Sequence, residues 1–173
     1  SADLGFNSEF TLSSKLKMNL FVFNGEGYKS LQDDNGYQRI GTSFIYNFSD
    51  KIFGKIYLDS HPSKDADAIT NSSIFVGYKE SNFRLGVEYG KIKNGRTYKN
   101  ADQNHNRDGY SIFAIKSLKN NFEIYARYDS INSNILNGQI TPWNDNNDGK
   151  LFVIGSEHEV TKGVKFNLNY RVF

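Results

Sequence analysis

Stretches of about ten residues in which apolar and polar side chains alternate constrain this chain more than any other feature. The last stretch is the clearest, with Val164, Phe166, Leu168, Tyr170 and Val172 in one set and Lys165, Asn167, Asn169 and Arg171 in the other. Because successive side chains of a β-strand point to opposite sides, each set is one face of a strand. The same pattern predicts ten strands over the whole chain, and no helical period competes with it.

The links between these stretches alternate in length. Very short polar links fall at 13–15, 49–51, 80–82, 117–121 and 161–163, and long links rich in Asn, Asp and Gly fall near 24–36, 60–72, 92–109 and 130–149. A strand that crosses a bilayer needs about 9–11 tilted residues. Outer-membrane barrels have short turns on one rim and long loops on the other. The sequence therefore predicts an all-β, antiparallel transmembrane β-barrel, with residues 1–173 as a single barrel domain or barrel segment.

Composition narrows the functional classes. The chain has 173 residues and no cysteine, which excludes disulfides, zinc-cysteine sites and thiol catalysis. No apolar run reaches about 18 residues, so no transmembrane helix is predicted. Aromatic residues make up 15% of the chain, which suits the aromatic girdles of a barrel but also the core of a soluble all-β domain. A net charge of +2 is too small to indicate nucleic acid as a partner.

Two points stay open at this level. The runs Ile112–Ile115 and Leu151–Ile154 are continuously apolar, so that either register is possible for the strands that contain them. A soluble antiparallel sandwich would show the same alternation as a barrel. The aromatic residues that end apolar faces near turns, at Phe48, Tyr89 and Tyr128, and the regular alternation of link lengths favour the barrel.

The ends of the chain add a further expectation. With ten strands and short first and last links, both ends fall on the rim of the long loops. Bacterial single-chain barrels have an even number of strands and short turns on the periplasmic side. We therefore expect this sequence to start and stop inside a larger barrel, with further strands before Ser1 and after Phe173.

Six short segments of the sequence are informative through their order and spacing. They are Asn24–Lys29 (NGEGYK), Asp33–Gly36 (DDNG), Glu123–Asp129 (EIYARYD), Asn147–Gly149 (NDG), Lys162–Lys165 (KGVK) and Asn167–Tyr170 (NLNY). In this arrangement the chain resembles, over nearly its whole length, the C-terminal half of the phosphate-selective porin family. The resemblance implies a barrel of about sixteen strands. It also implies a homotrimer in the bacterial outer membrane that passes small anions.

Basic side chains on the predicted polar faces are the candidates for lining a pore. They are Lys17, Arg39, Lys55, Arg84, Arg127, Lys165 and Arg171. Rings of Arg and Lys favour the passage of anions, and the guanidinium group matches carboxylate or phosphate oxygens in pairs. Alternatively, Glu88 and Glu123 could pair with Arg84 and Arg127 across neighbouring strands and stiffen the wall. We therefore keep Arg39, Lys165 and Arg171 as the better pore candidates.

No residue pattern in the sequence indicates a metal site or a catalytic site. Asn144, Asn146 and Asp148 precede Gly149 in a rhythm similar to a calcium loop, but its twelfth position is Gly155 instead of Glu. Asn, Asp and Gly are common in turns, which explains this cluster better. The three histidines lack metal-ligand spacing, and no spacing indicates a nucleophile with its base. We predict no catalytic residues, no metal site and no cofactor, and hence no enzyme.

Together these patterns predict a porin that lets small, phosphate-like anions diffuse passively through a water-filled lumen, with outer-membrane lipid around it. Two alternatives remain. One is a plugged or structural outer-membrane barrel whose loops bind a partner. The other is a soluble β-sandwich that binds glycans through loop aromatics such as Tyr98 and Trp143.

Overall fold

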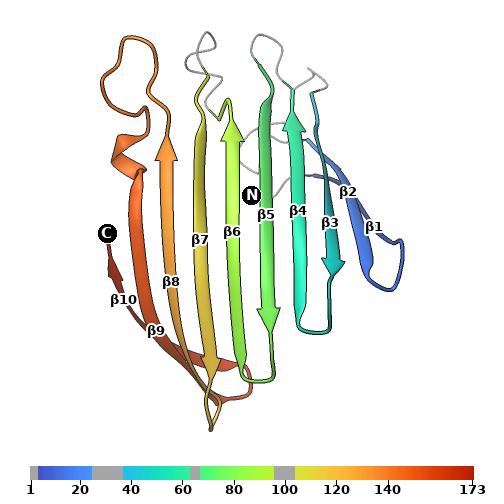
Figure 1. Cartoon of the computed structure of the whole chain (residues 1–173), viewed down its shortest axis with the longest axis vertical. Helices are drawn as coiled ribbons and strands as arrows, with labels where there is room; N and C mark the ends of the chain where they lie inside the picture. Colours follow the sequence, from blue (N-terminus) through green and yellow to red (C-terminus); the bar gives the residue numbers. More distant parts are fainter. Residues whose placement is uncertain (1–3, 25–36, 63–66, 96–103) are drawn as a thin grey trace.

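The structure, a computed structural model, describes residues 4–24, 37–62, 67–95 and 104–173. Its strands are β1 (Gly5–Thr11), β2 (Leu16–Phe23), β3 (Arg39–Asn47), β4 (Ile52–His61), β5 (Ile69–Lys79), β6 (Phe83–Lys93), β7 (Arg107–Ser117), β8 (Phe122–Ser133), β9 (Gly149–Thr161) and β10 (Val164–Val172), with one short 3-10 helix, η1 (Asp145–Asn147). All ten strands form one sheet in which each pairs with its neighbours in sequence (Figure 1). The predicted all-β fold with ten antiparallel strands is confirmed. Within the described ranges, no helix is long and apolar enough to cross a membrane.

Short turns and long connections lie at opposite ends of the sheet, as expected (Figure 1). Two of the tight turns are closed by serine side chains that accept backbone N–H groups. Ser13 Oγ accepts from Leu16 at 3.1 Å, and Ser49 Oγ accepts from Ile52 at 3.1 Å. In the turn after β7, Asn121 has a φ of 55°, a left-handed conformation that asparagine tolerates better than most residues.

Strand β5 is longer than the sequence pattern suggests. It was expected from about residue 73, but it begins at Ile69. Thr70, Asn71 and Ser72 continue the ladder with β4, because backbone pairing does not require an apolar side chain. Tyr98 and the segments 25–29 and 33–36, on which part of the family resemblance depends, lie outside the described residues.

The pairing register assigns every strand to two faces and settles the two open registers. Ile112 pairs with Val87 and Tyr128, so it shares their apolar face, while Phe113 pairs with Gly86 and Arg127 on the other face. The same reasoning places Phe152 and Ile154 on the apolar face and Leu151 and Val153 opposite. We call these the apolar face, which carries residues such as Ile56, Ile74 and Val87, and the polar face, which carries Arg39, Asp59 and Arg127.

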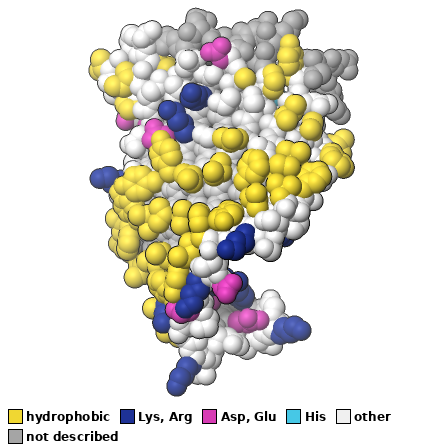
Figure 2. Space-filling model, turned by 45° about the vertical axis from the view of Figure 1, so that its right-hand side comes forward, with side chains coloured by type: hydrophobic (Ala, Val, Ile, Leu, Met, Phe, Trp, Pro, Cys, Tyr) yellow, Lys and Arg dark blue, Asp and Glu magenta, His cyan; other side chains and the backbone are white. Residues whose placement is uncertain are grey.

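No second layer of described residues covers the apolar face. On it, the exposed fraction is 47% for Ile56, 50% for Ile74 and 51% for Ile154, and among the described residues only Phe21 and Leu136 are buried hydrophobics. Figure 2 shows hydrophobic side chains gathered in a band across the middle of the molecule, with charged side chains mostly beyond its edges. A soluble domain buries the apolar face of a sheet against another layer. The sandwich interpretation is therefore wrong for this chain.

Aromatic rings lie over glycines on the polar face. A Cβ atom added to Gly86 would lie 2.4 Å from Phe113 Cζ, and one added to Gly41 would lie 2.2 Å from Phe21 Cζ. The rings of Phe75 and Phe113 are stacked with centroids 6.2 Å apart, which extends the aromatic row across neighbouring strands. These glycines are needed because the rings occupy the space that a side chain would fill.

Candidate functional site on the polar face

All seven basic residues predicted to line a pore lie on the polar face. The register places Lys17 opposite Ile45, Lys55 opposite Phe75, and Arg84 opposite Ile115 on this face. On the other strands, the same alternation places on the polar face Arg39, Arg127, Lys165 and Arg171. The alternation of the sequence therefore gave the correct side of the sheet for each of them, while their role in a pore stays a prediction.

Five of the seven basic side chains form ion pairs with carboxylates. The pairs are Lys17–Glu9 at 2.9 Å, Arg39–Asp59 at 2.5 Å, Arg84–Glu123 at 2.7 Å, Arg127–Asp129 at 2.9 Å and Lys165–Glu157 at 2.6 Å. Pairing balances the positive charge of each of these residues locally. Ion pairs as exposed as Lys17–Glu9 contribute little to stability, so their main effect is on the distribution of charge over the polar face.

The Arg39–Asp59 pair is the centre of a buried polar cluster. The Asp59 side chain is fully buried, with 0% of its surface exposed. It accepts hydrogen bonds from Arg39 Nη2 at 2.5 Å, the Tyr57 hydroxyl at 2.5 Å and Asn71 Nδ2 at 2.6 Å. Buried carboxylates need several donors to offset their lost hydration. The cluster therefore joins β3, β4 and β5 near the end that carries the long connections.

The partners of the basic residues differ in part from the expected ones. Arg84 pairs with Glu123 as proposed, reaching over β7, but Arg127 pairs with Asp129 of its own strand instead of with Glu88. Arg39 and Lys165, kept as pore candidates, are both ion-paired, because their partners lie at diagonal positions on the neighbouring strand.

Two of the seven basic residues have no ion pair within the described part of the chain. Lys55 has none, and Arg171 donates from Nε to the neutral Asn169 side chain at 3.0 Å. Their charge is therefore not balanced by a neighbouring carboxylate.

The connection 134–148 packs against the ends of β7 and β8. Trp143 Nε1 donates to the Asn106 carbonyl oxygen at 2.9 Å, and the backbone N–H of Asn106 donates to Asn134 Oδ1 at 2.7 Å. Asp148 accepts hydrogen bonds from the hydroxyl and the backbone N–H of Ser133. The calcium-like rhythm is thus part of a turn network. In the described ranges, no group of three or more His, Cys, Asp or Glu side chains is placed to hold a metal ion.

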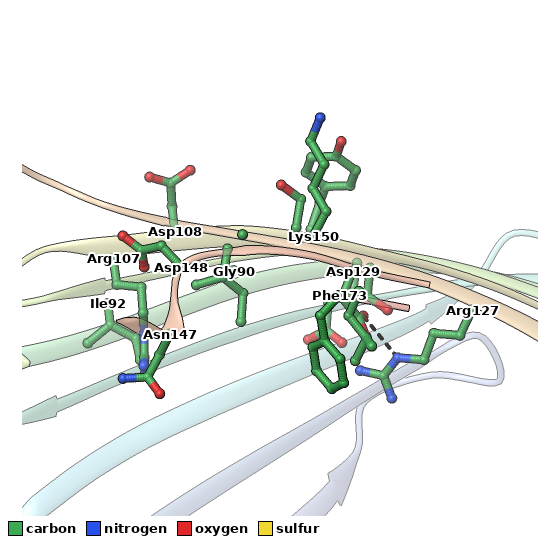
Figure 3. Close-up of a pocket in the computed structure, with 18 of the residues that line it drawn as sticks. Gly90, Ile92, Arg107, Asp108, Arg127, Asp129, Asn147, Asp148, Lys150 and Phe173 are labelled. Carbon is green, nitrogen blue, oxygen red and sulfur yellow. Dashed lines mark hydrogen bonds and ion pairs between the residues drawn. The ribbon is translucent and has the colours of Figure 1, made fainter. Parts of the chain in front are cut away.

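Two cavities meet at Arg107, the first residue of β7. The larger, of about 730 Å³, is lined by Glu88, Arg127 and Asp129 among others, and the smaller, of about 370 Å³, by Arg39, Asn71 and Trp143 among others; Arg107 lines both. Figure 3 shows Arg107, Ile92 and Asn147 on one side of the sheet and Asp108 and Lys150 on the opposite side. Most of the strand residues that line the two cavities belong to the polar face, and residues of the connection 134–148 line both.

Comparison with known proteins identifies the fold. No protein-family model matches the chain, and no curated protein matches it. Among solved structures, a refined crystal structure of a porin superposes on 98% of this chain with a TM-score of 0.71 and 9% sequence identity. The fold is similar to that of part of a porin. The chain spans 56% of the length of that porin. Identity this low shows the fold alone, so membership of the phosphate-selective family stays a prediction.

Sequence reasoning missed one basic residue of this porin-like wall. Residues 92–109 were interpreted as a long link, which left Arg107 outside any strand. In the structure β7 begins at Arg107. The Arg107 side chain points to the polar face, as do Ser111 and Phe113 further along the strand. Alternation between the two faces, followed from Ile112 towards Arg107, could have placed this residue on the polar face. This step requires the register of the apolar run that contains Ile112, which the sequence leaves open.

Proposed function

We propose that this chain forms part of the wall of a bacterial outer-membrane porin through which small solutes diffuse passively. The observation that carries the proposal is the single-layer sheet with two unlike faces. Its exposed apolar face suits contact with lipid, and its charged face suits a water-filled lumen. Such a channel needs no catalytic residue and no cofactor, because solutes move down their own gradient.

The open edges of the sheet favour a larger barrel. Strand β1 pairs only with β2 and strand β10 only with β9, so each has one unpaired side among the described residues. Unpaired backbone groups in the hydrocarbon core cost several kcal/mol each, which is why membrane sheets close into barrels. Further strands would complete a barrel of about sixteen, the number implied by the family resemblance. A homotrimer is proposed from that resemblance alone.

A preference for anions is supported by the polar-face charges that carry no ion pair. Within the described ranges, the basic residues of this kind are Lys55, Lys79, Arg107 and Arg171, and the acidic ones are Glu88 and Glu159. Basic side chains along a narrow aqueous path raise the local anion concentration and exclude cations. We propose that the solutes are small anions such as phosphate.

The reversal potential in a planar bilayer under a KCl gradient tests both levels of this proposal. The detergent-extracted native protein should give a stable conductance with chloride selectivity. Lys55→Glu combined with Arg171→Glu should shift the potential toward cation selectivity, while Lys116→Gln, on the apolar face, should leave it unchanged. An unaltered anion preference in the double variant would contradict the assignment of these residues to the permeation path.

A plugged or structural barrel is the second candidate. The connection 134–148 favours it, because Trp143 and Asp148 tie this segment to the ends of β7 and β8, and its residues line two cavities there. A folded, detergent-extracted sample without conductance would support the plugged barrel over the open channel.

A further inference from the structure

Arg107 differs from the other polar-face arginines in its surroundings. Arg39, Arg84 and Arg127 form ion pairs, and Arg171 donates to Asn169. The half-buried side chain of Arg107 forms no hydrogen bond and no ion pair with any described residue. A guanidinium group has five N–H donors in a planar fork, and carboxylate or phosphate oxygens satisfy them best. This arginine is therefore available to a ligand.

The smaller cavity beside Arg107 has a positively charged lining. Its ionisable lining residues are Arg39, His105 and Arg107, and no carboxylate is among the described residues that line it. Asp59, which pairs with Arg39, is not among them and is itself fully buried. The larger cavity, in contrast, is lined by basic and acidic side chains together. An anion is thus favoured specifically in the smaller cavity.

The same cavity has an apolar and aromatic side. Ile69, Ile92 and Trp143 line it. The indole ring is held in place by its hydrogen bond to the Asn106 carbonyl oxygen at 2.9 Å and by an edge contact with the buried His105 ring, with centroids 5.1 Å apart. The volume of about 370 Å³ lies in the usual range of ligand pockets, about 300–1,000 Å³. It therefore has room for more than an inorganic oxyanion.

We propose that this cavity binds small organic oxyanions, with the carboxylate or phosphate group on Arg107 and the apolar body against Trp143 and Ile92. Asn71 and Asn144 also line the cavity and can add hydrogen bonds to such a ligand. The inference deepens the proposed function, because it names the class of solute that the channel would hold at its long-loop end.

Intrinsic fluorescence tests the site without relying on conductance, because Trp143 is the single tryptophan of the chain. Benzoate and phenyl phosphate, added to the detergent-extracted protein, should change the fluorescence saturably and at lower concentrations than acetate and inorganic phosphate. Arg107→Gln should weaken binding of both aromatic probes at least about tenfold, the usual range for a charge-assisted hydrogen bond. Arg107→Lys should recover part of the affinity, because it restores the charge without the planar fork.

Lys91→Gln is the matched control. Lys91 precedes Ile92 on β6 but points to the apolar face, so its removal lowers the positive charge at the same end of the sheet without touching the cavity. Its affinity for the probes should equal that of the native protein. Equal weakening by Lys91→Gln and Arg107→Gln would overturn the site in favour of a general charge effect. Inorganic phosphate binding as tightly as phenyl phosphate would overturn the part played by the apolar wall.

A bilayer recording separates this inference from the proposed function. In a conducting protein, benzoate should block the current saturably, and Arg107→Gln should relieve the block. A conducting protein with no saturable fluorescence response would overturn the site and leave the channel intact. An Arg107-dependent fluorescence response in a protein that conducts no ions would support the site and contradict the channel.

Discussion

Placing an arginine on either face of β5 tests which face contacts lipid. Ile74 is the central residue of β5, lies on the apolar face and is 50% exposed, whereas its neighbour Ser73 lies on the polar face opposite Tyr57. An arginine at the bilayer midplane of a β-barrel costs about 2–4 kcal/mol. At about 1.4 kcal/mol for each factor of ten, Ile74→Arg should lower the folding equilibrium constant about 30- to 700-fold. Ser73→Arg should change it little, because the polar face lines a water-filled lumen in the proposed channel.

Urea titrations of the protein refolded in phospholipid vesicles measure this difference directly. Both variants introduce the same side chain at adjacent positions of one strand, so the main difference between them is the face that the arginine enters. If the apolar face were solvated, Ile74→Arg would stay within about 0.5 kcal/mol of the native protein, as most exposed substitutions do. Equal free energies of unfolding for the two variants would refute lipid contact on the apolar face.

Three further predictions concern the stability of the wall. Gly86→Ala should cost about 1–3 kcal/mol in a urea titration, because its Cβ would lie 2.4 Å from a phenyl ring atom, whereas Gly90→Ala, whose nearest neighbours would be 3.8 Å away, should be tolerated. Asp59→Ala should cost about 3 kcal/mol in the same assay, since it removes three hydrogen bonds in a buried cluster; a neutral result would mean that water replaces the carboxylate. In the turn region, the hydrogen bond from Lys51 holds the pKa of Glu80 below its ordinary value of 4.5. The contribution of this pair to stability should be complete above about pH 4.5 and lost as the pH falls through the lowered pKa. Below that pH, the free energies of unfolding of the native protein and of Glu80→Gln should become equal, which unfolding titrations at several pH values measure.

The short motifs behind the family resemblance indicated the fold but not the selectivity. The order of the segments indicated a porin, and the porin-like fold agrees with that. The finer assignment to phosphate selectivity depended on basic residues whose partners the sequence does not reveal. Arg39 illustrates this, because it was kept as one of the better pore candidates, but its Nη2 lies 2.5 Å from Asp59 Oδ2. Twenty residues separate the two in sequence, and only the β3–β4 register brings them together.

Local alternation determined the strands and the faces of most side chains, because the period of two belongs to each strand by itself. It therefore fixed the number of strands, the positions of the short turns and the polar side for residues such as Lys55 and Arg171. The tertiary structure decided what depends on more than one strand. It set the register of the continuous apolar run at Ile112, the ion pairs across neighbouring strands, and the cavity that Arg107 and Trp143 line together. These features follow from cross-strand pairing and loop packing, whose partners lie far apart in the sequence and carry no local pattern.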